Sequence, residues 1–287
     1  MGGIIITSMK TIRKIGVVLK EGCDIDGGQL AIEALQKHIY MDDVVQLDRL
    51  LIKEQDPLYL DAVVDLNEHL KASVKEALVL GEFPLVFGGD HALAIGSITG
   101  VATEDHSVLW IDAHGDCNTH ESSDSKRIHG MPLAIVQGHG HSALTNLVDH
   151  AIKPRNILLI GIRSLDQAEE DLMTQWGVRW VTMEEIRVQG LEWLHNEVMI
   201  FAHHAKHLHV SFDCDSMDPL HFPGVNTPVR GGFIAAEIMP LLEDVIKLEQ
   251  LSSMDIVEYN PKRDPNFDTM NLILTITKMV EDRYGRK

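Results

Sequence analysis

Cysteine is scarce in this sequence: the chain of 287 residues contains only three, Cys23, Cys117 and Cys214. Three cysteines are too few for the disulfide framework of small secreted proteins, so we expect free thiols and a reducing, cytoplasmic location. The sequence also lacks an apolar run of about 18 residues, the length needed to cross a bilayer. Its first 14 residues have no basic segment ahead of an apolar one, so we expect no signal peptide.

Basic residues are also in short supply. The chain has 25 lysines and arginines against 43 aspartates and glutamates, and its formal net charge is −18. A protein this acidic repels phosphate backbones and anionic lipids, so we expect neither nucleic acid nor a membrane as a partner. A small cationic substrate would suit the charge, although acidity also serves solubility alone. The length and a hydrophobic content of 45% suit one α/β domain over residues 1–287.

Apolar runs rich in β-branched residues alternate with amphipathic segments along the whole chain. The expected strands are residues 12–19, 44–52, 84–87, 107–111, 156–160, 178–181, 208–212 and 250–257. The expected helices are residues 29–38, 60–80, 92–101, 132–137, 167–175, 191–205, 234–248 and 269–281. This alternation predicts a mostly parallel, eight-stranded sheet covered by helices on both faces. In such sheets, ligands bind beyond the carboxyl ends of the strands.

Acidic and imidazole side chains follow four of the expected strands, within five residues of the strand end. Glu258 follows the last strand, and the other three strands are followed by candidate metal ligands: His91, Asp112, His114, Asp116, Asp213 and Asp215. Within residues 112–116 the candidates occupy every second position, so an extended chain would point all three toward one side. Two carboxylates and an imidazole crowded in this way would repel each other or shift their pKa values unless a cation lies among them.

Four carboxylates and two imidazoles are too many ligands for one tetrahedral zinc ion. They suit two divalent ions about 3.5 Å apart that share bridging carboxylates. Mn²⁺ fits this mixture of donors best, because Mg²⁺ prefers fewer histidines and Zn²⁺ fewer carboxylates; Co²⁺, Fe²⁺ and Ni²⁺ are the expected substitutes. A paired site lowers the pKa of a bridging water and produces hydroxide near neutral pH, which suits the hydrolysis of a poor electrophile.

Three motifs resemble the metal motifs of the ureohydrolase (arginase/agmatinase) family. They are Gly-Gly-Asp-His at 88–91, Asp-Ala-His-Gly-Asp at 112–116 and Ser-Phe-Asp-Cys-Asp-Ser-Met-Asp-Pro at 211–219. The resemblance implies a three-layer αβα fold, two manganese ions per subunit, a trimer or hexamer, and hydrolysis of a guanidinium group to an amine and urea. The ligands it implies are His91 and Asp116 for the first ion, His114 and Asp215 for the second, and Asp112 and Asp213 as bridges between them.

The same resemblance assigns roles beside the ions. His129, in the segment Ile-His-Gly-Met-Pro-Leu at 128–133, matches a proton-shuttle histidine, a role that suits a group with a pKa near working pH. Glu258 matches the glutamate that anchors the guanidinium, and Thr227 is similar to a threonine near the metal-bound hydroxide. The bridging hydroxide would attack the guanidinium carbon, and Asp116 and His129 would relay a proton to the departing amine.

The loop after residue 116 carries the features that distinguish arginine from other guanidino compounds. Asn118 and Ser125 match arginase positions that read the α-carboxylate. Arg127 and the preceding lysine stand where arginases usually have Gly-Asn. A guanidinium would pair with a carboxylate more strongly than an amide would, but a solvated charge or a different guanidino acid is the alternative. Asp166 and Glu169 match acids for the α-amino group. Agmatine has no α-carboxylate, so this loop favours arginase.

Three alternatives remain open. An agmatinase or another guanidino-acid ureohydrolase would share all the proposed metal ligands. A zinc deacetylase on a related sheet would need one metal ion and fewer carboxylates, and a non-catalytic relative would be expected to lack a ligand or Glu258. Two segments have no assigned role: residues 20–28 lack the prolines typical of the family, and we interpret the histidines within 203–209 as a solvated helix end leading into a strand.

Overall fold

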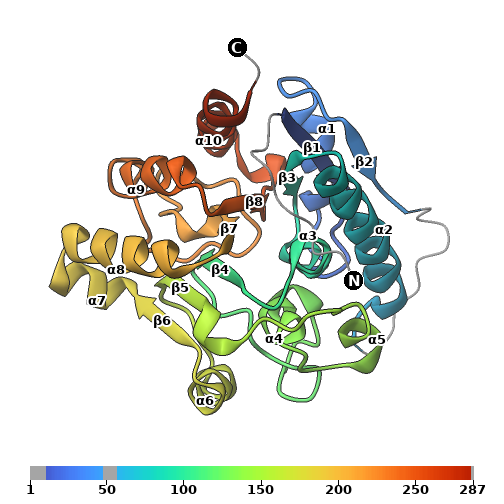
Figure 1. Cartoon of the computed structure of the whole chain (residues 1–287), viewed down its shortest axis with the longest axis horizontal. Coiled ribbons are helices and arrows are strands. Elements are labelled where there is room, and N and C mark those ends of the chain that lie inside the picture. Colours follow the sequence, from blue (N-terminus) through green and yellow to red (C-terminus); the bar gives the residue numbers. More distant parts are fainter. Residues whose placement is uncertain (1–10, 48–56, 286–287) are drawn as a thin grey trace.

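An eight-stranded sheet lies at the centre of the computed structural model, which describes residues 11–47 and 57–285 (Figure 1). The strands are β1 (Thr11–Val17), β2 (Asp43–Val45), β3 (Glu82–Gly88), β4 (His106–Ile111), β5 (Ile157–Ile162), β6 (Arg179–Thr182), β7 (His207–Asp213) and β8 (Leu251–Val257). Their order in space is β2-β1-β3-β8-β7-β4-β5-β6, and all pairings between these strands are parallel. The predicted sheet is therefore confirmed.

Helices cover both faces of this sheet (Figure 1). They are α1 (Ala31–Leu35), α2 (Leu60–Val79), α3 (Ala94–Val101), α4 (Pro132–Val136), α5 (Ser142–Thr145), α6 (Gln167–Trp176), α7 (Met183–Gln189), α8 (Leu191–His204), α9 (Ala235–Lys247) and α10 (Asp268–Tyr284). Leu109 and Ile111 of β4 pack with α1 and α7–α10, whereas Val108 and Trp110 pack with α3, α4 and α6. Because alternate residues of one strand contact opposite helical layers, the molecule is a three-layer αβα sandwich.

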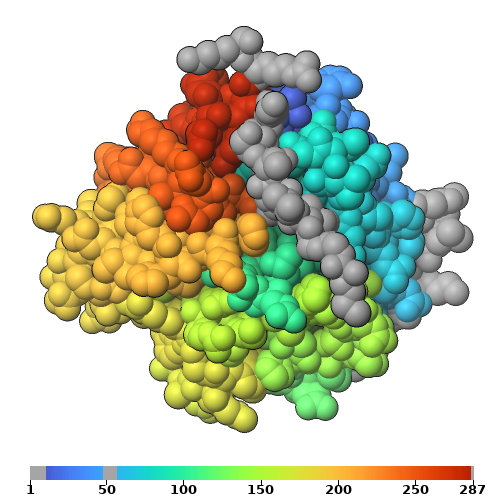
Figure 2. Space-filling view, in the orientation of Figure 1, coloured from blue at the N-terminus to red at the C-terminus, as the bar shows by residue number. Residues whose placement is uncertain are grey.

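The order of the strands explains where a site would form. The four strands that are followed by acid or histidine, namely β3, β8, β7 and β4, are consecutive neighbours in the middle of the sheet. All run in the same direction, so their carboxyl ends meet at one edge. Segments that are far apart in the sequence are therefore brought together there. In the space-filling view, orange, green and yellow-green segments likewise adjoin near the centre of one face (Figure 2).

The observed elements differ from the predicted ones mainly at their ends. The observed strand is shorter than the predicted strand 44–52, because β2 ends at Val45. Residues 48–52 of the predicted strand lie outside the described residues. The helix predicted at 29–38 begins as a 3₁₀ turn (Gly28–Leu30) and its α-helical part ends at Leu35. Helices α5 and α7 were not predicted. The sequence did signal α7, because the Thr182 side chain accepts a hydrogen bond from the Glu185 amide (3.1 Å), as in a Thr-x-x-Glu cap.

In the part of the chain that the structure describes, no helix combines the length and apolar character needed to cross a membrane.

Candidate metal centre and active site

His91 lies at the centre of the first group of candidate ligands. Its Nδ1 atom is 3.2 Å from Asp112 Oδ2, 3.0 Å from Asp116 Oδ2 and 3.0 Å from Asp213 Oδ2. Despite these distances, Nδ1 has no hydrogen-bond partner among the described residues, whereas Nε2 of the ring contacts Ser211 Oγ at 2.8 Å. An imidazole that donates through Nε2 keeps a lone pair on Nδ1. A buried lone pair that converges with three carboxylates fits a bound cation.

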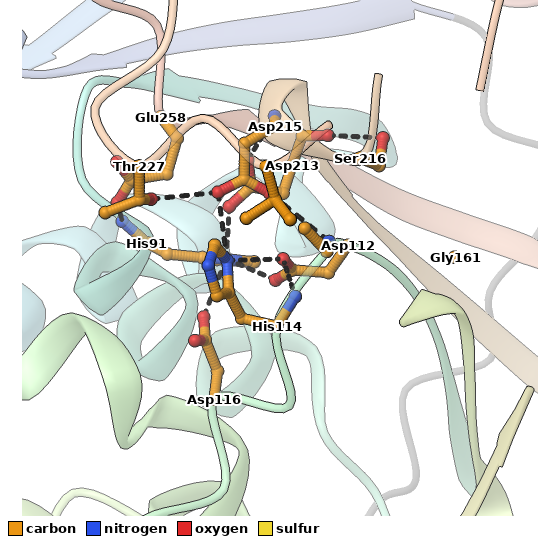
Figure 3. A network of polar contacts seen from close by, with 12 residues as sticks. His91, Asp112, His114, Asp116, Gly161, Asp213, Asp215, Ser216, Thr227 and Glu258 are labelled. Carbon is orange, nitrogen blue, oxygen red and sulfur yellow. Dashed lines mark hydrogen bonds and ion pairs between the residues drawn. The ribbon is translucent and has the colours of Figure 1, made fainter. Parts of the chain in front are cut away.

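His114 belongs to a second group that shares Asp112 with the first. Its Nδ1 atom lies 3.0 Å from Asp215 Oδ2 and 3.5 Å from Asp112 Oδ1, and its backbone amide donates to Asp112 Oδ1 at 2.8 Å. Thr227 Oγ1 donates to Asp215 Oδ2 at 2.9 Å. In Figure 3 the carboxylates of both groups point toward the two imidazole rings. One carboxylate between two sets of donors is the arrangement that a pair of ions would need.

The buried carboxylates of this cluster oppose one another's ionisation. Burial raises the pKa of Asp213 well above its usual value, and repulsion from Asp215 and Asp112 adds to the shift. Burial together with Asp112 also raises the pKa of Asp116 to about 6. Asp112 differs: burial opposes its ionisation, but contacts with His114 and His91 outweigh burial and lower its pKa. Divalent cations would neutralise this accumulated charge, so the donor set fits the metal ions that the sequence predicts.

Loop geometry, and not the alternation of a strand, brings residues 112–116 together. Strand β4 ends at Ile111, so Asp112, His114 and Asp116 lie in the loop beyond it. Asp116 adopts a left-handed backbone conformation with φ of +48°, which turns its side chain back toward the strand ends. The prediction that these side chains converge agrees with the structure, but the extended chain that we invoked for it is wrong.

Glu258 and His129 lie together beside His91. Glu258 is buried, and its Oε1 accepts a hydrogen bond from the His91 amide (2.9 Å) and lies 3.3 Å from His129 Nδ1. Its Oε2 accepts a bond from the Asn226 side chain (2.7 Å). Burial opposes ionisation of Glu258, but His129 and the two N–H donors lower its pKa, so the carboxylate is charged. Burial likewise opposes protonation of His129, yet Glu258 raises its pKa.

Three of the predicted substrate-binding residues form one hydrogen-bonded group. Asn118 Nδ2 donates to Asp166 Oδ2 at 2.8 Å, and the other oxygen of Asp166 caps α6 by accepting the Glu169 amide at 2.8 Å. Glu169 Oε1 in turn accepts the backbone amide of Cys117 at 2.8 Å. Burial raises the pKa of Glu169 to about 8. The structure thus brings the acids of α6 to the loop that follows Asp116.

Ser125 and Arg127 lie further along the same loop. Ser125 Oγ accepts the Arg127 amide at 3.3 Å and is 3.4 Å from Ser123 Oγ. Within residues 11–47 and 57–285, the Arg127 guanidinium forms no ion pair. Its charge is close enough to Cys23 to lower the pKa of that thiol, although burial raises that pKa overall. Arg127 therefore offers an unused cation near the candidate active site.

Several residues that hold the ligands in place were missed by sequence reasoning. Trp110 stacks on His91, with ring centroids 4.1 Å apart, and donates Nε1–H to Asp112 Oδ2 at 2.8 Å. Ser211, which contacts the far side of the His91 ring, donates to Asp255 Oδ1 at 2.5 Å. A signal was available for Ser211, because it precedes Asp213 by two positions within β7 and therefore shares its side of the sheet. Trp110 gave a weaker signal, since its partner Asp112 already lies beyond the end of β4.

Arg163 gave no such signal, because its partners are backbone oxygens. Its guanidinium donates to the carbonyl oxygens of Asp215 (2.7 Å), Gly161 (3.0 Å) and Val229 (2.8 Å). These bonds tie the loop after β7 to the loop after β5. Such contacts between distant loops leave no pattern in the sequence.

The histidines within residues 203–209 do not gather around a common point. Helix α8 ends at His204 and β7 begins at His207, so a helix end does lead into a strand, as we interpreted it. His203 and His204 are exposed. His209 is buried, and its ring contacts Ser253 Oγ at 2.8 Å and Asp255 Oδ2 at 3.0 Å.

Comparison with known proteins identifies the family. The model of the Arginase family matches residues 19–280. This chain belongs to the arginase family. An arginase from Bacillus caldovelox is 36% identical over 291 aligned residues, which cover 93% of this chain and 97% of that protein. The crystal structure of an arginase from Bacillus cereus superposes with a TM-score of 0.88 at 31% identity, over 97% of this chain and 99% of that chain.

A third arginase-family relative was solved with a bound ligand. The crystal structure of Entamoeba histolytica arginase in complex with L-ornithine has a TM-score of 0.87 and 27% identity, and the match covers 96% of this chain and 99% of that chain. Membership of the arginase family makes this protein a metal-dependent ureohydrolase, an enzyme that hydrolyses a C–N bond of a guanidino group.

Proposed function

We propose that this arginase-family enzyme hydrolyses L-arginine to L-ornithine and urea, with two Mn²⁺ ions per subunit. One observation carries the proposal: a group suited to an amino-acid head lies directly beside the cluster of candidate metal ligands. Glu169 accepts the amide of Cys117, the residue after Asp116, and Asn118 donates to Asp166. Agmatine keeps the ammonium group that Asp166 and Glu169 would bind, but it has no carboxylate for Asn118.

The residues that would hold the ions are divided as the resemblance implied: His91 and Asp116 for one, His114 and Asp215 for the other, and Asp112 and Asp213 shared. When bound, the two ions would supply a hydroxide at neutral pH and stabilise the charge that develops around the guanidinium carbon during the reaction. The lone pair of His91 Nδ1, unpartnered in the described part of the chain, supports this assignment. Oxygen donors outnumber nitrogen donors, which favours Mn²⁺ over Zn²⁺; Co²⁺, Fe²⁺ and Ni²⁺ are the substitutes to test.

The chain's own residues would orient the guanidinium and move protons. The buried, charged carboxylate of Glu258 would pair with the planar cation and hold its carbon at the cluster. Thr227, bonded to Asp215, would fix the other side of the reacting centre. Attack by water breaks the bond between this carbon and the side-chain nitrogen, and Asp116 would carry a proton from the attacking water to the departing amine.

His129 would exchange that proton with solvent. Its ring is partly exposed, with 15% of the side-chain surface accessible, and its Nδ1 lies 3.3 Å from the guanidinium-anchoring carboxylate. A histidine whose pKa is raised by that carboxylate is protonated more fully at neutral pH and can donate to an amine.

The other end of arginine would lie along the loop after Asp116. Asn118, Ser125 and Arg127 would bind the α-carboxylate, and Asp166 and Glu169 would bind the α-ammonium group. Because burial raises the pKa of Glu169 to about 8, its side chain is largely protonated at neutral pH in the absence of substrate. A bound ammonium would favour its charged form, so its pKa would fall when substrate binds.

Urea release from arginine and agmatine, assayed side by side with manganese-loaded protein, tests this function. We expect urea from arginine and at least about 100-fold lower kcat/KM for agmatine, the loss expected when roughly 3 kcal/mol of charge pairing is absent. Urea from agmatine alone would overturn the arginine assignment and leave the ureohydrolase intact. Urea from neither, with both ions bound, would point to another guanidino acid.

We also propose that the enzyme works in the cytoplasm, as a single catalytic domain that assembles into a trimer or hexamer. Three free, buried thiols support a reducing compartment. The assembly rests on the family resemblance. Light scattering should therefore give three or six times the mass of one chain, and a monomeric mass at working concentration would refute the assembly.

A further inference from the structure

A third group of potential metal ligands lies beside the proposed active site. Ligand atoms of Cys23, His129 and Glu258 all lie within 4.8 Å of one another. Cys23 belongs to segment 20–28, which departs from the family pattern and has no role in the proposed reaction. The group is distinct from the two carboxylate-rich groups around His91 and His114, because it alone contains a thiol.

The position of Cys23 is defined by contacts on both sides. Its backbone amide donates to Asp90 Oδ2 at 2.8 Å, and the carbonyl oxygen of Gly22 accepts the amide of His129 at 3.2 Å. Residue 22 has no room for a side chain, because a Cβ atom there would lie 2.5 Å from Asp90 Oδ1 and 2.6 Å from Ala92 Cβ. Segment 20–28 is thus fitted against the loop that carries the proposed proton shuttle.

The Cys23 thiol has an unusual setting for a core cysteine. The residue is fully buried, yet its sulfur has no hydrogen-bond partner in the described part of the chain. Cys117, by comparison, accepts a bond from the Gln137 side chain at 3.7 Å. Of the charges that act most strongly on Cys23, those of Glu258, Asp90 and Asp213 are negative and that of Arg127 is positive. A buried anionic pocket with an unpartnered sulfur favours a thiophilic cation.

We propose that Cys23, His129 and Glu258 form a zinc site that inhibits the enzyme. A thiolate, an imidazole and a carboxylate are donors that Zn²⁺ prefers, and water would complete a tetrahedron. Typical zinc bond lengths place the donor atoms about 3.4–3.6 Å apart. His129 Nδ1 and Glu258 Oε1 are already 3.3 Å apart, and Cys23 offers its sulfur within 4.8 Å of a ligand atom of each residue. The thiol would release its proton to solvent as the Zn–S bond forms.

The inhibitory effect rests on the proposed function. Zinc at this site would occupy the carboxylate that anchors the substrate guanidinium and the nitrogen that exchanges the proton. Zinc and arginine would therefore compete for Glu258. The two-ion centre contains no sulfur donor, so the thiolate distinguishes the third site chemically from the other two.

Inhibition kinetics combined with a metal count test the inference. Zn²⁺ is added to manganese-loaded enzyme, initial rates are measured over a range of arginine concentrations, and bound Mn²⁺ and Zn²⁺ are counted after desalting. We expect one additional zinc, full retention of manganese and an apparent KM at least tenfold higher. In Cys23→Ala and in the closer isostere Cys23→Ser, at least tenfold more zinc should be needed for the same fractional inhibition. Cys117→Ala also removes one buried thiol, but it should need the same zinc concentration as wild type for the same fractional inhibition.

Two results would overturn the zinc site. One is unchanged zinc sensitivity in both Cys23 variants, and the other is inhibition that increases in proportion to the manganese lost from the enzyme. Each variant is compared with itself with and without zinc, so a change in its basal rate does not affect the conclusion.

A spectroscopic test does not depend on urea release. Co²⁺ bound in place of Zn²⁺ should give a thiolate-to-cobalt charge-transfer band in the near ultraviolet, present in Cys117→Ala and absent in both Cys23 variants. If the charge-transfer band appears but the enzyme releases no urea from arginine, the third site is supported and the proposed function is refuted. Urea from arginine without a band would overturn the third site alone.

Discussion

At the scale of single residues, the candidate site depends on side chains that are fixed before any ligand binds. Glu258 is an example: both of its oxygens already accept N–H donors, from His91 and Asn226, although the residue has a left-handed φ of +61°. A non-glycine residue in this conformation costs free energy, so the surrounding contacts must hold it there. The result is a preorganised carboxylate facing His129.

Glu258→Gln removes the charge and keeps the shape of this side chain. We expect kcat/KM for arginine to fall by about 100-fold or more. A buried charge pair contributes roughly 3 kcal/mol, and each loss of about 1.4 kcal/mol lowers kcat/KM tenfold. Manganese content should not change, since Glu258 is not among the proposed ligands. Steady-state urea release and a metal count measure both quantities. A kcat/KM within threefold of wild type would contradict the role.

Arg127→Ala tests how arginine is distinguished from agmatine. We expect KM for arginine to rise about tenfold, because a charge-assisted hydrogen bond contributes roughly 1.5–3 kcal/mol, while any activity on agmatine should not fall. Lys126→Ala is the matched control, because its Nζ bonds the carbonyl oxygen of His120 and not the proposed substrate. Equal losses for both substrates, or for both variants, would show that Arg127 does not read the carboxylate.

At the scale of elements, the strands and the ligands that follow them could be predicted from sequence because both signals are local. Hydrophobic runs mark β3, β4, β7 and β8, and acidic or histidine residues lie at or just beyond the end of each. Segment 20–28 could not be placed in this way, because its position depends on distant contacts: Gly22 with His129, and Asp26 with Asn260. Cys23 therefore looked like an isolated cysteine in the sequence, although it lies beside His129 and Glu258.

The edge strand β2 gives a prediction for pH dependence. Asp43 accepts bonds from Arg13 Nε (2.7 Å) and Ser73 Oγ (2.8 Å), and the Arg13 bond lowers its pKa below the usual 3.8 despite partial burial. Asp43→Asn should reduce the free energy of unfolding by about 1 kcal/mol at pH 7. A lowered folded-state pKa stabilises the protein above pH 3.8, and this contribution is lost as pH falls through the folded-state value.

Urea unfolding of wild type and Asp43→Asn at pH 7, 5, 4 and 3 measures that difference. It should be constant from pH 7 to 5 and shrink below pH 4. A difference that stays the same down to pH 3 would show that the charge on Asp43 contributes nothing.

At the scale of the whole molecule, bound ions should stabilise the fold. The net charge of the chain is −18, and four carboxylates are concentrated at one sheet edge with little access to solvent. A ligand at 100 to 1,000 times its Kd stabilises the native state by about 3–4 kcal/mol. Removing the metal with a chelator should therefore lower the Tm by on the order of 10 °C, and Mn²⁺ should restore it. Equal melting curves with and without chelator would argue against an ion at this cluster.

The proposed reaction requires two manganese ions, held by the six candidate metal ligands His91, Asp112, His114, Asp116, Asp213 and Asp215. Stepwise addition of Mn²⁺ to metal-free protein, followed by urea release at saturating arginine, tests it most directly. We predict no urea without metal and a rate that rises to a plateau at two equivalents per chain. A plateau at one equivalent would contradict the paired site, and no urea at any Mn²⁺ concentration would contradict the proposed reaction.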